Sequence, residues 1–392
     1  MVTSKYHESE RMRKVQSPII PVIGKLIGET PGTISLAQGV VYYGPPPQAL
    51  EKLSTINSSV DNHKYGSVSG KTELLECISQ KLCEENKIKI NDGNKILVTA
   101  GANMAFLNTM FAITDPGDEI VLQRPYYFNH EMAINMLNCK AVCVPTDKNY
   151  QLNLDNIKAA ITDKTRAIVS NSPNNPSGVV YPEDQLKQLN NFCKEAGIYH
   201  ISDEAYEYFT FNNATHYSPA SENGTEDHTI SIFSLSKAYG FAAWRIGYMV
   251  IPQHLFNAIM KAQDTNLICP SIPSQYAAIG ALQTGKKYCE DKMEPIRQVR
   301  ELMLEELERL NTICEVPESN GAFYLFIKLK TGKNDIDVVN TLIKKYKIAV
   351  IPGYTFGMTD GCYLRISYGA PDKDTAITGI KRLVLGIKSI YK

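Results

Sequence analysis

The chain has 392 residues, of which 43% are hydrophobic and 21% charged, a composition typical of a globular protein and not of a disordered one. Forty-one basic residues balance forty-one acidic ones, so no overall charge favours nucleic acid or a membrane surface. The nine cysteines form no CxxC pair and do not accompany histidines at metal-ligand spacing, which predicts free thiols and no metal site. The polar N-terminal stretch has neither a signal peptide nor a membrane span, and we therefore expect a cytoplasmic protein without membrane or nucleic-acid partners.

Short β-rich runs alternate with helical segments along most of the chain, the order expected for an α/β fold with a largely parallel sheet. Helices are predicted at 104–113 and, from apolar residues spaced three apart, at 183–196. After residue 274 the pattern changes to long charged helices, which predicts a second, smaller α+β domain joined by the N-terminal segment. The predicted strands are 95–99, 119–123, 166–170, 199–202, 229–233 and 246–251, followed in the second domain by 323–329, 348–352 and 363–368.

The run SLSKAYGFAAWRIGY follows a predicted strand and contains Lys237. A lysine amine in this place can form a Schiff base with a carbonyl cofactor and later act as a general base. Ser234, Ser236 and Arg245 surround it in the sequence, and a planar guanidinium binds phosphate oxygens in pairs. A surface lysine beside a helix-capping serine is the alternative interpretation of this run.

A second run of polar residues, Ser202 to Tyr206, lies at the end of another predicted strand. Asp203 could pair with a protonated pyridine nitrogen, which makes the ring an electron sink, and Tyr206 could donate to the ring's 3-oxygen. An ordinary acidic loop is the alternative. Glu204 and Glu207 are expected to be helix-start or solvent-facing charges.

Two turn-like runs offer further donors. In NSPNNPSG, prolines restrict the backbone, so Asn175 could be a preorganised donor to the same 3-oxygen as Tyr206; a simple tight turn is the alternative. Gly101-Ala102-Asn103 lie between a strand and a helix, where exposed N–H groups attract phosphate, although such loops also occur without a ligand.

Two isolated residues complete the set. Arg365 stands alone in the strand-like run YLRISYG, where it could clamp a substrate α-carboxylate or form a structural ion pair. Tyr127 follows a strand and could stack on a planar cofactor ring or belong to the core.

Taken together and in chain order, these runs resemble the class I and II aminotransferases, which are fold type I enzymes dependent on pyridoxal 5′-phosphate. The likeness extends from about Ser35 to the end of the chain. It implies a large cofactor-binding domain over 46–283, with a mostly parallel seven-stranded sheet, and a smaller α+β domain made of 1–45 and 284–392.

By the same resemblance, Lys237 holds the cofactor as an internal aldimine and is the catalytic base, with Asp203 and Tyr206 as catalytic partners. Tyr65 resembles the tyrosine that reaches the neighbouring subunit's phosphate, which implies a homodimer with shared active sites. The implied cofactor-binding residues are Gly101, Ala102, Asn103, Tyr127, Asn175, Asp203, Tyr206, Ser234, Ser236, Lys237, Arg245 and Tyr65, and the implied substrate-binding residues are Gly39, Asn175, Arg365 and Tyr42.

The implied reaction moves an α-amino group to a 2-oxo acid through the aldimine and a quinonoid. The stretches SLAQGVVYYGPP, TAGANMAF, PYYFN and YLRISYG are similar to a plant and bacterial subgroup. This subgroup includes plant aminotransferases that use methionine with aromatic 2-oxo acids. That likeness implies an apolar or aromatic amino acid as substrate, in a pocket with Tyr42, Tyr43 and Tyr127.

The chain departs from the family pattern at one place: after Tyr65-Gly66, the proline and arginine of many members are missing. A lyase or cyclase with the same cofactor, acting by elimination, replacement or cyclisation of a modified amino acid, is the alternative.

Overall fold

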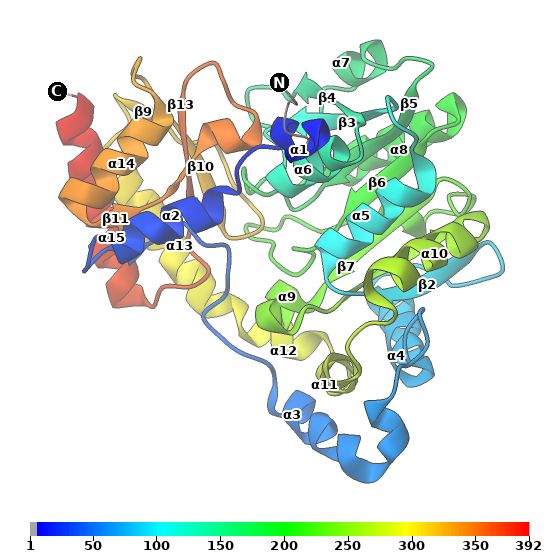
Figure 1. Ribbon diagram of the computed structural model, residues 1–392. Coiled ribbons are helices and arrows are strands. Elements are labelled where there is room, and N and C mark those ends of the chain that lie inside the picture. The colour runs from blue at the N-terminus through cyan, green and yellow to red at the C-terminus, as the bar shows by residue number, and fades with distance from the viewer. Residues whose placement is uncertain (1–5, 392) are drawn as a thin grey trace.

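The computed structural model describes residues 6–391 and contains a seven-stranded sheet in the order β2-β8-β7-β6-β5-β3-β4 (Figure 1). β8 runs antiparallel to β2 and β7, and the other neighbouring strands are parallel, which confirms the predicted fold class. The strands are β2 (Asn94–Thr99), β3 (Glu119–Arg124), β4 (Lys140–Pro145), β5 (Thr165–Asn171), β6 (Tyr199–Asp203), β7 (Thr229–Ser234) and β8 (Gly247–Pro252). The strand-by-strand prediction missed β4, an edge strand that is only partly buried and whose apolar run is just four residues long.

Helices cover both faces of this sheet, because successive strand residues point to opposite sides. Leu97 and Ile251 pack into one apolar cluster with the first set of helices, whereas Val98 and Val250 pack into another with helices of the second set. The first set is α5 (Ala102–Ile113), α6 (Phe128–Met136) and α10 (Phe256–Leu267), and the second is α4 (Thr72–Lys81), α8 (Glu183–Ala196) and α11 (Ile272–Leu282).

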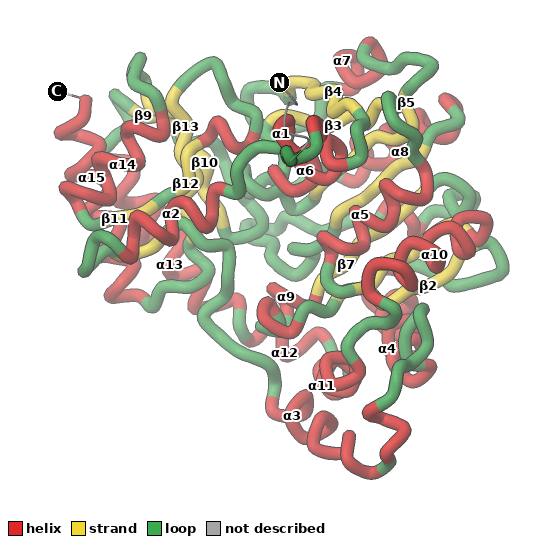
Figure 2. The backbone as a smooth tube through the Cα atoms, in the orientation of Figure 1, coloured by secondary structure: helices red, strands yellow, loops and turns green. Residues whose placement is uncertain are grey.

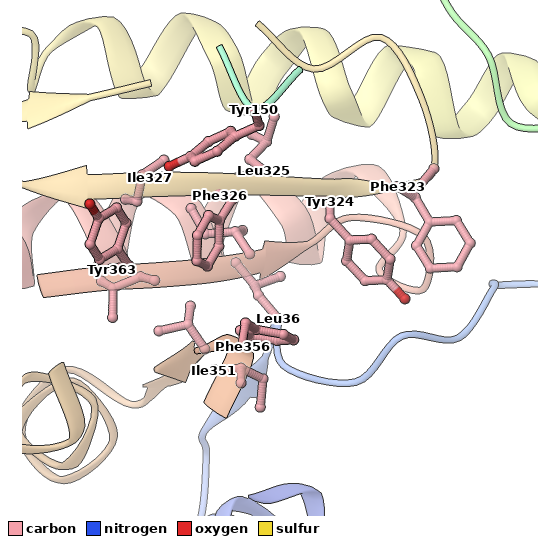
Figure 3. Close-up of a cluster of buried hydrophobic side chains, with 14 of the residues drawn as sticks. Leu36, Tyr150, Phe323, Tyr324, Leu325, Phe326, Ile327, Ile351, Phe356 and Tyr363 are labelled. Atoms are coloured by element: carbon pink, nitrogen blue, oxygen red, sulfur yellow. The ribbon is translucent and has the colours of Figure 1, made fainter. Parts of the chain in front are cut away.

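A separate four-stranded antiparallel sheet follows in the order β12-β13-β10-β9, as the change of pattern after residue 274 predicted. Side chains of its central strand β10 pack with Leu36 and Phe356 in a buried cluster (Figure 3). The predicted strand 348–352 is two short strands. The elements are β9 (Cys314–Glu315), β10 (Tyr324–Leu329), β11 (Ile348–Ala349), β12 (Ile351–Pro352) and β13 (Cys362–Ser367), with helices α13 (Met293–Glu308), α14 (Asp335–Tyr346) and α15 (Lys373–Tyr391).

The N-terminal segment joins these C-terminal elements (Figure 1). β1 (Ile34–Ser35) pairs in parallel with β11, so that Ile34 lies opposite Ile348. The Ser367 N–H also donates to the Leu36 carbonyl at 2.8 Å. The exact domain boundaries near residues 46 and 284 stay a prediction. Residues 1–5 and 392 of the predicted smaller domain lie outside the residues that the structure describes.

The connections are mostly short helices and loops (Figure 2). Their helices are α1 (Glu10–Lys14), α2 (Ile19–Gly28), α3 (Pro47–Ser54), α7 (Leu154–Ala159), α9 (Leu235–Ala238) and α12 (Lys286–Asp291). Within residues 6–391, no helix combines the length and the apolar character needed to cross a membrane.

Candidate active site

The site lies where neighbouring strands of the large sheet end. β5, β6 and β7 are parallel, and their last residues are Asn171, Asp203 and Ser234. The carboxyl ends of such strands meet at one edge of the sheet, where α/β proteins bind ligands. The turns after these strands therefore bring polar residues that are distant in sequence to the same place.

A cavity of about 280 Å³ opens at this edge. All but three of the predicted site residues line it; the exceptions are Gly101, Tyr42 and Tyr65. The predicted residues that line it are Gly39, Ala102, Asn103, Tyr127, Asn175, Asp203, Tyr206, Ser234, Ser236, Lys237, Arg245 and Arg365, and the lining also includes Ile20, Gln38, Val40, Phe128, Asn171, Ala205, Ala242 and Tyr324.

Lys237 lies on the one-turn helix α9, which begins where Ser234 caps it by accepting from the Ser236 N–H at 3.2 Å. Its Nζ donates to the carbonyl oxygen of Gly39. Burial, assisted by the positive charges of Arg365 and Arg245, lowers the pKa of the Lys237 amine to about 8. The neutral amine, which a nucleophile and base requires, is therefore far more abundant near physiological pH than in an ordinary lysine.

The Asp203 carboxylate is buried and held from two sides. His130 Nε2, on α6, lies 3.1 Å from its Oδ2, and the Ala205 N–H donates to its Oδ1 at 3.1 Å. His130 is itself buried. The sequence pattern did not identify His130, because its run follows a helical pattern without any spacing that points to Asp203.

Three polar side chains meet beside Lys237. The Asn175 amide donates to Tyr206 Oη at 3.5 Å, and Tyr206 Oη lies 2.7 Å from Tyr324 Oη. Burial and the neighbouring Tyr324 raise the pKa of Tyr206 well above its ordinary value, so this hydroxyl keeps its proton and can donate it in a hydrogen bond. Tyr324 was not predicted as a site residue, because it belongs to an apolar strand run in which an aromatic residue is expected to be part of the hydrophobic core.

A cluster of donors lies around the start of α5. The first N–H groups of a helix, here those of Ala102 and Asn103, have no acceptor within the helix and attract anions. Gly101 has a φ of +82°, and a Cβ there would lie only 2.6 Å from Arg245 Nη2. Glycine therefore lets the guanidinium approach the helix start, on the same side of the cavity as Ser234 and Ser236.

Arg365 lies on β13 and is almost fully buried, at 2% exposure. Its Nη1 donates to Asn175 Oδ1 at 2.9 Å and its Nη2 to the Ala37 carbonyl at 2.6 Å, while its buried Nε has no acceptor. The Tyr324 ring centroid lies 4.5 Å from the guanidinium carbon. A buried cation that lines a cavity and keeps an unused N–H is suited to bind an anion, and no carboxylate of the described chain pairs with it.

The remaining predicted residues differ in position. Tyr127 lines the cavity, and Gly101 borders it through Arg245. Tyr42 and Tyr65 do not line it: Tyr42 is 42% exposed and its hydroxyl lies 3.4 Å from the Lys292 carbonyl oxygen, and Tyr65 is 80% exposed. A substrate contact by Tyr42 therefore has no support in this single chain.

The prediction that Glu204 and Glu207 face solvent is wrong. Glu204 is buried and its carboxylate accepts from Ser218 and lies 2.9 Å from His216 Nε2. Glu207 pairs with Lys81 in a nearly buried ion pair. The turn after β6 folds back into the protein, so charges that look solvated in the sequence are neutralised inside it.

The donor set fits pyridoxal 5′-phosphate. The cavity offers an amine, a buried carboxylate for a ring nitrogen, two donors for a ring oxygen and a helix start with Arg245 for a phosphate. The unused Nε of Arg365 adds a place for a second anion, such as a substrate carboxylate. These groups match the cofactor's chemistry one by one.

Comparisons with known proteins agree with this arrangement. The family model "Aminotransferase class I and II" matches residues 31–383. An aromatic aminotransferase of Arabidopsis thaliana is 34% identical over 391 residues, 97% of this chain and 96% of the relative. A probable aspartate/prephenate aminotransferase of Aquifex aeolicus is 35% identical over 337 residues, 83% of this chain and 84% of the relative. The solved aromatic aminotransferase of Pyrococcus horikoshii is similar with a TM-score of 0.85 and 31% identity, covering 94% of this chain and 99% of that one.

Proposed function

Because this chain belongs to the class I and II aminotransferases, a family that depends on pyridoxal 5′-phosphate, we propose that it moves the α-amino group of an aromatic or apolar amino acid to a 2-oxo acid. The observation that carries the proposal is the position of Lys237, half-buried in the cavity that Arg365 and Arg245 also line, with a pKa lowered to about 8. Its Nζ would hold the cofactor and, once released, move a proton between carbon atoms.

Other residues of the chain would bind and orient the cofactor. Bound pyridoxal phosphate supplies a ring that takes up the electron pair released when the substrate's Cα–H bond breaks. The Asp203 carboxylate, which His130 contacts, would hold a proton on the ring nitrogen. Tyr206 and Asn175, which lie within 3.5 Å of each other, would donate to the ring oxygen. Phosphate binding falls to the α5 N-terminus, Ser234, Ser236 and Arg245, with Tyr127 against the ring.

The substrate's α-carboxylate fits Arg365, close to the Gly39 backbone. Its guanidinium is preorganised by Asn175 and Ala37 and keeps a free Nε–H. Because a bidentate pair orients as well as binds, the clamp would aim the substrate's Cα at Lys237.

The residues of the cavity walls indicate which class of substrate side chain the site would accept. Ile20, Val40 and Phe128 give them an apolar character, with Tyr324 nearby. Lys237, Arg245 and Arg365 are the cations among the described lining residues, and each already has a role. The described chain therefore supplies no further cation for a side-chain carboxylate, which favours an aromatic or methionine-like substrate over a dicarboxylic one.

Relatives named as aspartate aminotransferases make the acidic substrate the competing hypothesis. A half-reaction panel separates the two: each amino acid is added alone to the holoenzyme, and the conversion of the cofactor to its amine form is followed by absorbance. We expect conversion with methionine, phenylalanine, tyrosine or tryptophan at rates well above those with aspartate and glutamate. Preference for aspartate contradicts the substrate proposal, and released ammonia without an amino acceptor contradicts transamination.

Two wider features belong to the same proposal. The strongly exposed Tyr65 is available to a second copy of the chain, which supports a homodimer with shared sites. Nine free cysteines support a reducing compartment such as the cytoplasm.

A further inference from the structure

Residues 37–44, which we call the strap, connect the Arg365 side of the cavity to the turn that carries Lys237. At one end, the Ala37 carbonyl accepts from Arg365 at 2.6 Å and the Gly39 carbonyl accepts from Lys237 Nζ. At the other end, Tyr43 Oη lies 3.0 Å from the carbonyl oxygen of Lys237 and 3.2 Å from that of Ala238. The strap thus contacts both the side chain and the backbone of Lys237.

The backbone of Lys237 depends on such outside contacts. α9 runs only from Leu235 to Ala238, and a single turn of helix is not stable on its own. The last carbonyls of a helix have no partner within it. The hydroxyl proton of Tyr43 is shared between two of these carbonyls, and Cys289 Sγ lies 3.5 Å from the one on Ala238.

The strap and the turn are in direct contact. Gly240, directly after the turn, has a φ of +69°, and a Cβ on it would lie 2.6 Å from the Tyr43 carbonyl oxygen. The Tyr288 ring meets Tyr43 edge to face with centroids 6.1 Å apart, and its hydroxyl donates to the Gly44 carbonyl at 2.7 Å. These contacts hold the backbone and the ring of Tyr43 against the turn.

We propose that Tyr43 is a positioning residue: by donating to the carbonyls at the end of α9, it holds the backbone of Lys237 in register with the strap residues that face the substrate carboxylate. This role rests on the function proposed above. A shift of the Lys237 amine by a fraction of an ångström slows proton transfer, whereas carboxylate binding at Arg365 does not depend on it. Loss of the Tyr43 hydroxyl should therefore lower kcat and leave KM unchanged.

The test compares Tyr43→Phe with Tyr288→Phe as holoenzymes. Each variant removes one hydroxyl that donates to a backbone carbonyl and keeps the ring that packs in the cluster, so both should fold. We expect Tyr43→Phe to lower kcat about tenfold with KM for the amino acid within about twofold of wild type. Tyr288→Phe should keep both constants within about twofold. Equal kcat values for the two variants would overturn the proposal.

A second variant and a second measurement keep the role testable if transamination is not observed. Gly240→Ala pushes the strap from the turn without removing the hydroxyl, and it should lower kcat in the same selective way; a normal kcat contradicts the proposal. The rate at which apoenzyme acquires the visible band of lysine-bound cofactor should fall about tenfold in Tyr43→Phe and not in Tyr288→Phe. Wild type that transfers no amino group contradicts the proposed function, whereas wild type and Tyr43→Phe with identical rates in both assays contradict only the role of Tyr43.

Discussion

The two halves of the cavity are built from different kinds of chain segment. The cofactor half consists mainly of turns that follow β2, β3, β5, β6 and β7, and Arg245 lies just before β8, so each functional group adjoins a strand of one sheet. The substrate half consists of the strap, Tyr324 and Arg365. These come from opposite ends of the sequence and meet where β1 pairs with β11 and where Leu36 and Ala37 bond to β13. The residues that would bind the cofactor, which every substrate needs, thus lie around one sheet. The residues that would select the substrate lie on segments that only tertiary contacts bring together.

The largest expected effect comes from removing the residue that both halves share. Lys237→Ala should abolish the visible band of lysine-bound cofactor and lower kcat by at least about 10⁴-fold, since both the attachment point and the proton-transferring amine are lost. Absorbance spectra and single-turnover rates measure this. Lys261→Ala, an exposed lysine on α10, is the matched control and should behave as wild type. A surviving band in Lys237→Ala would show that another amine holds the cofactor.

A smaller effect should separate the two halves. Arg365→Lys keeps the charge and loses the planar fork, and we expect it to raise KM for the amino acid by about a hundredfold while the affinity for cofactor stays within about twofold. Arg245→Lys should do the reverse, weakening cofactor binding about tenfold with little change in KM. Steady-state kinetics and cofactor titration check both variants. If Arg365→Lys weakens the cofactor and not the amino acid, the division into halves is wrong.

The smallest expected effect is a shift in pH dependence. Below a pKa of about 8 the Lys237 amine is protonated, so cofactor incorporation into apoenzyme should speed up as pH rises through about 8 and then level off. A nearby positive charge disfavours the protonated amine, and its removal must raise this pKa. Arg365→Gln should therefore move the midpoint upward by about one unit, whereas Arg365→Lys, which keeps the charge, should leave it in place. Equal midpoints for the two variants would rule out the charge effect.

The sequence predicted the cofactor half far better than the substrate half, for a physical reason. Lys237, Asp203 and Asn175 each follow an apolar run that predicts a strand. Their convergence at one edge of a sheet could therefore be inferred from the order of strands and turns alone. His130 and Tyr324 were missed because a buried histidine in a helix and a tyrosine in a strand look like core residues. The residues that they contact, Asp203 and Tyr206, are distant in sequence, and such contacts depend on how the elements pack in the folded protein.

Within the strap, Gly39 lines the cavity as expected, but the two tyrosines differ from the expectation. Tyr42 was expected at the substrate, yet it is the neighbouring Tyr43 that bonds to the Lys237 turn. Adjacent residues of an extended segment point to opposite sides, and the sequence contains no regular pattern there to show which side faces the turn.

The pairing of β1 with β11 also has a consequence for how the protein is made. Ile34 leaves the ribosome before the strands of the seven-stranded sheet, whereas its partner Ile348 emerges only after them. The seven-stranded sheet, which lies between them in the chain, can condense while the N-terminal segment still waits for its strand. The cofactor half can therefore form before Arg365 exists, and the enzyme becomes able to select its substrate only after β13 has been synthesised.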